Sequence, residues 1–165
     1  MQTYSNNLLQ NNGFAFVLER IPQAIFRVTA ASVPSVSVPP AAAGYPGASQ
    51  SFPGTFTEFD DLTLEILVDE NLEAYEEIYR WMVKQRFAEN QVPKSDLDKP
   101  YVSDGVLTTM TNSSNPNRIF KFKSLFPIAM SALSFDTSIS SPEPVKCTVT
   151  FKYSYFELIP VGQVD

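Results

Sequence analysis

The hydrophobic period of this chain changes within one stretch that decides the fold, Asp61-Leu-Thr-Leu-Glu-Ile-Leu-Val-Asp-Glu-Asn-Leu-Glu-Ala-Tyr-Glu-Glu-Ile-Tyr-Arg-Trp-Met82. Its first half is apolar at every second position, which is the period of a strand, and its second half at every third or fourth, which is the period of a helix. The change falls at Asp69-Glu70-Asn71, where Asp and Asn are good N-cap residues and acidic groups suit the positive end of a helix dipole. The stretch therefore predicts a strand, a tight acidic turn and an amphipathic helix over about residues 71–87. The helix is expected to pack on the domain through Leu72, Tyr75, Ile78, Tyr79 and Met82.

Alternating apolar residues predict further strands on both sides of this stretch. They lie at residues 14–18, 26–30, 106–110 and 119–126, and in a long closing strand at 145–158. The closing strand has an apolar face, Cys147, Val149, Phe151, Tyr153 and Tyr155, and a polar opposite face. We expect a single α+β domain over residues 1–165, mainly β, built as an antiparallel barrel or sandwich with one main helix packed on it.

Composition agrees with this class. The 165 residues are 44% hydrophobic and 18% charged, which suits one globular domain with a sizeable core. Thirteen Phe and seven Tyr favour strands, and thirteen Pro argue against a mainly helical protein. Residues 1–12 are rich in Asn and Gln, so we expect a flexible N-terminal arm.

Charge and residue usage exclude several classes of protein. A net charge of −6 opposes tight binding to a nucleic-acid backbone, although an acidic wall would let DNA pass without sticking. The single Cys147 permits no intrachain disulfide, and the N-terminus lacks the pattern of a signal peptide. No window has the roughly 20 apolar residues of a membrane span, so no membrane span is expected.

The candidate catalytic groups do not converge. Asp60 and Asp61 are neighbours in an extended segment, so their side chains point to opposite faces. Cys147 has no histidine to activate it, because the chain contains none. No phosphate-binding glycine loop or nucleophile elbow is present. We therefore expect no enzyme activity, no catalytic or metal-binding residues and no cofactor.

A basic and aromatic segment has two interpretations. Lys121 and Lys123 alternate with Phe120 and Phe122, a mixture that can mark a nucleic-acid surface. The alternation instead places both phenylalanines toward a core and both lysines toward solvent or another subunit. The acidic net charge favours the second interpretation.

Residues 39–54 form a long uncharged segment between two strands. Long loops inside a compact domain are more often functional than not. The residues singled out there are Pro39, Pro40, Gly44, Tyr45, Pro46, Phe52 and Pro53. The segment either buries itself on another subunit or forms an Ω-loop packed on its own domain.

The order of these features resembles the tail-tube proteins of contractile-tailed bacteriophages. The resemblance rests on the strand Phe59-Asp-Asp-Leu-Thr-Leu-Glu-Ile66, on Val68-Asp-Glu-Asn71, and on the helix ending near Trp81. Downstream, the aromatic segment Phe120–Pro127 leads to Leu133-Ser-Phe-Asp136 and then to the closing strand. The resemblance covers roughly residues 14–158. The segment 39–54 and an insert at 89–105 depart from the family in composition.

This resemblance implies a structural virion protein. Its hexameric rings would stack into the inner tube of a contractile tail, which pierces the host envelope and conducts DNA without binding it specifically. Implied partners are further copies of the chain, the tail sheath, a baseplate or tube-initiator protein, a tape measure protein and a tail terminator. Assembly would take place in the host cytoplasm. The resemblance also favours residues 39–54 as an inter-subunit loop.

Other functions remain open from the sequence. A tube-initiator protein of the baseplate, or a tube subunit of a bacteriocin or type VI-like injection machine, would share these features. The residues alone also allow a monomeric β-barrel binding module. Solution size distinguishes the two classes, because a tube protein forms rings or polymers.

Overall fold

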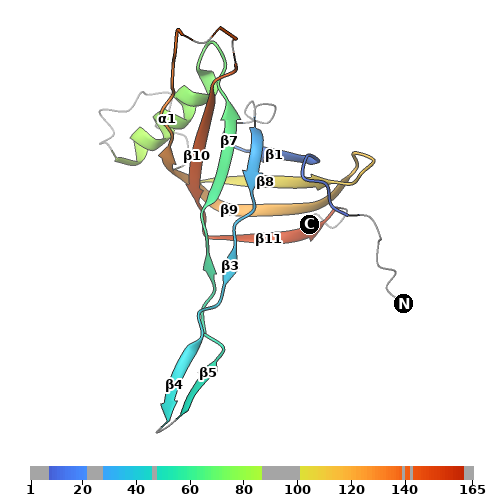
Figure 1. Cartoon of the computed structure of the whole chain (residues 1–165), viewed down its shortest axis with the longest axis vertical. Coiled ribbons are helices and arrows are strands. Elements are labelled where there is room, and N and C mark those ends of the chain that lie inside the picture. Colours follow the sequence, from blue (N-terminus) through green and yellow to red (C-terminus); the bar gives the residue numbers. More distant parts are fainter. Residues whose placement is uncertain are drawn as a thin grey trace.

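The computed structural model describes residues 8–21, 28–45, 48–86, 101–138, 140–141 and 143–161. Within these ranges the chain forms eleven strands and one helix (Figure 1). Predictions for residues 1–7, Phe26, Pro46 and 87–100 fall outside the described residues. The predicted class is confirmed as mainly β with antiparallel sheets and one packed helix. The sheets form an open sandwich rather than a closed barrel.

Two antiparallel sheets make up the sandwich. The first has the order β1-β8-β9-β11. Its strands are β1 (Phe14–Leu18), β8 (Ser103–Met110), β9 (Pro116–Met130) and β11 (Tyr155–Pro160). The second has the order β9-β10-β7-β2. Its other strands are β2 (Val28–Ser32), β7 (Leu62–Leu67) and β10 (Lys146–Lys152). Because β9 pairs in both, the two sheets share one strand.

The strand β9 turns a corner at Ser124, whose φ of 56° lies in the left-handed region that few non-glycine residues adopt. Before the corner β9 lies between β8 and β11, and after it β9 pairs with β10. The registers Lys152↔Phe126 and Tyr155↔Lys123 continue each other across the corner. β9 and the consecutive strands β10 and β11 therefore form one long two-stranded ribbon that bends from one sheet into the other.

The bend corrects the prediction of an unbroken closing strand at 145–158. The chain leaves the ladder at Tyr153 and Ser154, so β10 and β11 are separate strands. Cys147, Val149 and Phe151 are buried as expected, but Tyr155 is 45% exposed. The physical reason is that a strand paired to a bent partner must bend with it, which resets its inside–outside alternation.

The core lies between the sheets and under the helix α1 (Glu73–Arg86). Its fully buried side chains include Trp81, Phe122, Phe151, Ile21, Leu62, Leu125, Val149, Pro127 and Cys147. The alternation that predicted β7 holds, since Leu62, Leu64 and Ile66 are all buried. Burying side chains of this size stabilises each by about 1.5–3 kcal/mol relative to exposure.

The packed stripe of α1 differs from the predicted one. Ile78 belongs to the core, and Tyr75 and Met82 are partly buried against it. Leu72 and Tyr79, also predicted to pack, are 38% and 54% exposed. The helix begins at Glu73, and Leu72 precedes it with a φ of 55°. Among the side chains of α1 described, over residues 73–84, those that are buried are the predicted Ile78 and, in addition, Ala74, Trp81 and Lys84.

The acidic turn before α1 serves as its start. The backbone amide of Leu72 donates to the carbonyl of Asp69 at 3.0 Å, which closes the turn. The amide of Glu73 approaches the Asp69 carboxylate at 3.5 Å, and Glu73 and Glu76 lie in the first turn of the helix. The Asp69 carboxylate accepts from a free backbone amide at the start of the helix, and the acidic side chains offset the positive end of the helix dipole, as the sequence predicts.

Candidate functional site: the projecting arm

Residues 33–45 and 48–60 form an arm that extends away from the two sheets (Figure 1). It contains two short antiparallel ladders in succession. Near the sandwich, β3 (Val36–Ser37) pairs with β6 (Glu58–Phe59). Farther out, β4 (Ala41–Tyr45) pairs with β5 (Ala48–Phe52). The segment 39–54, which the sequence predicts as an extended loop, is thus mostly a two-stranded ribbon.

The two segments of the arm are in close backbone contact between these ladders, at Pro39 and Gly54. A Cβ added to Gly54 would collide with the carbonyl oxygen of Pro39 and would also lie 3.6 Å from Cγ1 of Val38. Only glycine allows this approach, because the Cβ of any other residue would strike a backbone oxygen, which cannot rotate away as a side chain could. The arm therefore has a tight waist at Pro39 and Gly54.

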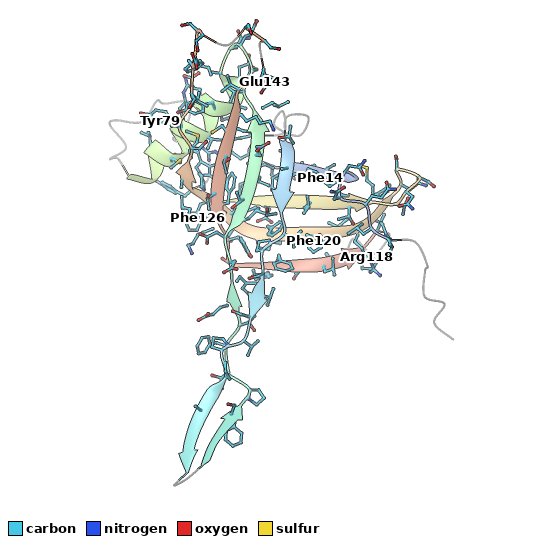
Figure 2. All side chains as sticks on the ribbon, viewed as in Figure 1. Phe14, Tyr79, Arg118, Phe120, Phe126 and Glu143 are labelled. Carbon is cyan, nitrogen blue, oxygen red and sulfur yellow. The ribbon has the colours of Figure 1, made fainter. Side chains whose placement is uncertain are left out.

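The arm beyond its root carries no charge and exposes apolar side chains among small polar ones. No charged residue occurs between Arg27 and Glu58. Several large apolar side chains of the arm are about half exposed, namely Val36, Val38, Phe52 and Phe56. The side chains drawn there stand out from the ribbon with no second layer of structure beside it (Figure 2). Exposed apolar surface of this kind marks interaction sites.

Hydrogen bonds hold the root of the arm. The amide of Asp60 donates to the carbonyl of Ser35 at 3.1 Å, and the Ser35 hydroxyl donates to the Asp60 carboxylate. The hydroxyl of Tyr153, at the corner of the sandwich, donates to the carbonyl of Asp60 at 2.9 Å. Asp61 instead forms an ion pair with Lys152 at 2.9 Å. The two neighbouring carboxylates thus have separate partners, and the described residues contain no cluster of three metal-ligating side chains.

The outer face of the second sheet is polar and its charges are matched. Glu65 on β7 pairs with Lys146 on β10 at 2.9 Å, and Thr29 on β2 donates to Glu65 at 2.9 Å. The hydrogen bond from Lys146 is the main reason that the pKa of Glu65 lies below its ordinary value. Each charged residue of these pairs meets an opposite charge within the sheet.

The basic segment of β9 separates its two faces as predicted. Phe122 is completely buried, whereas Lys123 forms an ion pair with Asp104. Burial would raise the pKa of Asp104, but the hydrogen bonds from Lys123 and from the Ser124 amide outweigh it and lower that pKa. Lys123 is therefore engaged within its own sheet.

Cys147 lies in the core and is completely buried. Burial raises the pKa of its thiol, and the hydroxyl of Ser131 lies 3.7 Å from the sulfur. A buried thiol with a raised pKa is a poor nucleophile. The side chain acts as a small core residue.

These features describe a packed sandwich with an exposed arm, and the class of protein follows from the family to which the chain belongs. The chain belongs to the phage tail tube protein family, which it matches over residues 8–158. The family consists of structural proteins, so the chain is not an enzyme. Among the described residues, no helix is long and apolar enough to cross a bilayer.

Particular relatives agree with this family. The chain is 26% identical over 117 residues to the tail tube terminator protein of Enterobacteria phage T4, and the match spans 68% of this chain and 63% of that protein. Its fold is similar to a chain of the anti-feeding prophage tube-terminating cap, with a TM-score of 0.67, 17% identity and coverage of 98% and 97%. It is also similar to a chain of the sheath–tube complex of an extracellular contractile injection system, with a TM-score of 0.66, 16% identity and 94% coverage of both chains. The protein is thus a component of the kind found in phage tails and related contractile machines.

Sequence reasoning missed the contacts that fix the arm and the corner. Nothing in the local pattern connects Tyr153 with Asp60, which lies 93 positions away, or Asp104 with Ser124. Local periodicity carries no signal for either contact, because each joins residues far apart in the chain.

Proposed function

We propose that this protein forms hexameric rings that stack into the inner tube of a contractile tail, with the arm as the contact between subunits. The observation that carries the proposal is the arm, which is long, has no charged residue between Arg27 and Glu58, and exposes Val36, Val38, Phe52 and Phe56. Ordering such a segment costs on the order of 1 kcal/mol of backbone entropy per residue. Burial of its exposed Phe and Val side chains on another copy would offset part of this cost.

Sheet edges give the proposal further support. β1 and β11 lie at the edges of the first sheet, and β2 lies at an edge of the second. Exposed edges present unpaired backbone groups that pair readily with another chain. In a closed ring each subunit covers an edge of the next, which satisfies these groups without leaving an open end.

The proposal includes passage of DNA through the tube without specific binding. Its support is the net charge of −6 and the pairing of Lys146, Lys152 and Lys123 with acidic side chains. Lysines held in ion pairs contribute little to counterion release, which is the main source of affinity for DNA. Sheath, baseplate and tape measure proteins would be partners of the tube, and host cytoplasm its place of assembly.

A second candidate function is a terminating ring that ends the tube. It is favoured by the similarity to the T4 tail tube terminator protein and to the anti-feeding prophage cap. A terminator and a tube subunit share the fold but differ in polymerisation. A tube subunit forms long tubes by itself at high concentration, whereas a terminator stays as single rings and attaches to tube ends.

The test is electron microscopy and light scattering of the purified chain with and without residues 41–51. The full chain is expected to form rings or tubes, and the deletion variant to stay folded without elongating. Phe52→Ser is expected to weaken elongation, while Phe135→Ser, at an exposed phenylalanine outside the arm, serves as the matched control. Dispersed monomers of the full chain at every concentration would refute the proposal, and normal tubes from the deletion variant would refute the role of the arm.

A further inference from the structure

An aromatic cluster connects the root of the arm to the corner of the sandwich. We use this name for Phe59 of β6 together with Phe120, Phe122, Tyr153 and Phe156. The ring of Phe59 lies 5.6 Å from that of Phe156, edge to face, and 6.1 Å from that of Tyr153. Ring pairs at these distances and tilts attract each other beyond simple burial.

The cluster reaches from the arm into the buried core. Tyr153 and Phe156 both pack on Phe122, with ring centroids at 5.1 and 5.6 Å, and Phe122 is completely buried. Phe120 adds a contact to Phe156 at 6.0 Å. Phe59 is the single member that belongs to the arm. Its ring is therefore the point where the arm meets a rigid support.

Hydrogen bonds further restrict the root of the arm next to Phe59. The Tyr153 hydroxyl donates to the carbonyl of Asp60, the residue directly after Phe59. The Asp60 carboxylate in turn accepts one hydrogen bond from the Ser35 hydroxyl, and the Asp60 amide donates to the Ser35 carbonyl. Ser35 precedes β3 and Asp60 follows β6. Both segments of the arm are thus connected by hydrogen bonds to the side chain of Tyr153 at the corner.

In the described part of the arm beyond β3 and β6, no aromatic ring pair or side-chain hydrogen bond to the sandwich is found. Its first ladder has two residue pairs, Val36↔Phe59 and Ser37↔Glu58, and the waist at Pro39 and Gly54 separates it from β4 and β5. A two-stranded ribbon is marginally stable alone. The direction of the arm must therefore be set by the contacts at its root.

From these contacts we propose that Phe59 and Tyr153 are positioning residues that set the direction in which the arm leaves the sandwich and so hold it ready for stacking. The inference rests on the proposed function of the arm. A prepositioned arm loses less conformational entropy on binding than a swinging one, so assembly begins at lower protein concentration. The same cluster lies at the corner where β9, β10 and β11 meet. It therefore fixes the direction of the arm relative to both sheets.

The test measures arm direction and assembly separately. Spin labels at Ser51→Cys on the arm and Asn112→Cys on the β8–β9 turn, with Cys147 replaced by alanine, report the distance distribution below the concentration at which rings form. Phe59→Leu is expected to widen this distribution at least twofold and to raise the concentration needed for assembly about tenfold. Tyr153→Phe keeps the ring and removes only its hydrogen bond, so it should give a smaller change in the same direction.

Matched controls are Phe56→Leu, an exposed aromatic on the arm outside the cluster, and Tyr155→Phe, an exposed tyrosine two positions from Tyr153. Neither should alter the distances. An unchanged distribution in Phe59→Leu, or a widened one with unchanged assembly, would overturn the inference. Failure of the unmodified chain to form rings would instead overturn the proposed function, while the distances would still decide whether the cluster directs the arm.

Discussion

The carboxylate of Asp104 accepts a hydrogen bond from the backbone amide of Ser124 at 3.1 Å, directly at the corner of β9. Its second oxygen pairs with Lys123, the residue before the corner. The left-handed backbone of Ser124 interrupts the ladder, and the side chain from β8 replaces the missing acceptor. One aspartate thus stabilises the bend on which both sheets depend.

Removing this carboxylate should loosen the corner. Asp104→Ala leaves the Ser124 amide without its acceptor, and we expect a loss of about 1–3 kcal/mol in the free energy of unfolding. Asp104→Asn should cost less, because an amide oxygen can still accept from Ser124. Urea unfolding followed by tryptophan fluorescence measures both. Equal stability of Asp104→Ala and the unmodified chain would contradict this role.

The same carboxylate should contribute to acid sensitivity. The pKa of Asp104 in the folded chain lies below its ordinary value of 3.8 because its hydrogen bonds outweigh its burial. Its contribution to stability is therefore present above that ordinary value and is lost as the pH falls through the lowered pKa. Comparing urea midpoints at pH 6 and pH 3 should show a smaller acid-induced loss in Asp104→Asn.

The waist of the arm gives a prediction with an internal control. Gly54→Ala would place a methyl group against the Pro39 carbonyl, so the two chains of the arm must separate. We expect faster hydrogen exchange in β3 and β6 and impaired assembly, with the melting temperature of the sandwich nearly unchanged. Gly44→Ala is the control, because nothing lies within 4 Å of the added Cβ. Similar effects of both variants would contradict the waist.

Trp81 should be the most important side chain of α1. It is completely buried, its Nε1 donates to the carbonyl of Tyr101 at 2.7 Å, and Arg20 lies 4.9 Å from its ring. Trp81→Ala should cost about 3–5 kcal/mol, measured by calorimetry or denaturant unfolding. Tyr79→Ala, on the exposed side of the same helix, should stay within about 0.5 kcal/mol of the unmodified chain.

Tyr153 should make stability fall at high pH. Burial, with the nearby Asp60 and Asp61 charges, raises the pKa of Tyr153 to about 12. The folded chain therefore holds this proton more tightly than the unfolded chain, whose tyrosine has an ordinary pKa of 10.0. The stabilisation is complete below pH 10 and is lost as the pH rises toward 12. Denaturant midpoints from pH 9 to 11 should fall less in Tyr153→Phe than in Tyr155→Phe.

Periodicity in the sequence predicts the central elements well. The alternation of Leu62, Leu64 and Ile66 located β7 and its buried face, since burial on one side of a sheet imposes a period of two. The acidic turn located the start of α1 within two residues. The predicted packing face of α1 was less accurate. Tyr75 and Tyr79 are the same residue type and cannot be distinguished by a hydrophobic pattern, yet tertiary contacts bury Tyr75 more than Tyr79.

The corner and the arm could not be derived in the same way. Ser124 carries no local signal for a left-handed backbone, because the Asp104 contact that stabilises it lies 20 positions earlier. The strands β4, Ala-Ala-Ala-Gly-Tyr, and β5, Ala-Ser-Gln-Ser-Phe, show no alternation of large apolar and polar residues to detect. The segment could still be predicted as a candidate interaction site, since its length and lack of charge are visible in composition alone.

The strand β9 has a consequence for how the chain folds. It hydrogen-bonds to β8, β10 and β11, so separating either sheet also breaks the ladder of the other. We expect the sandwich to unfold in one cooperative transition, without a state in which a single sheet persists. β8 and β9 are joined by a short turn, whereas β1–β8 and β7–β10 join residues far apart in the chain. Closing those long loops is slow, so the hairpin of β8 and β9 should form first and act as the template on which the remaining strands are added.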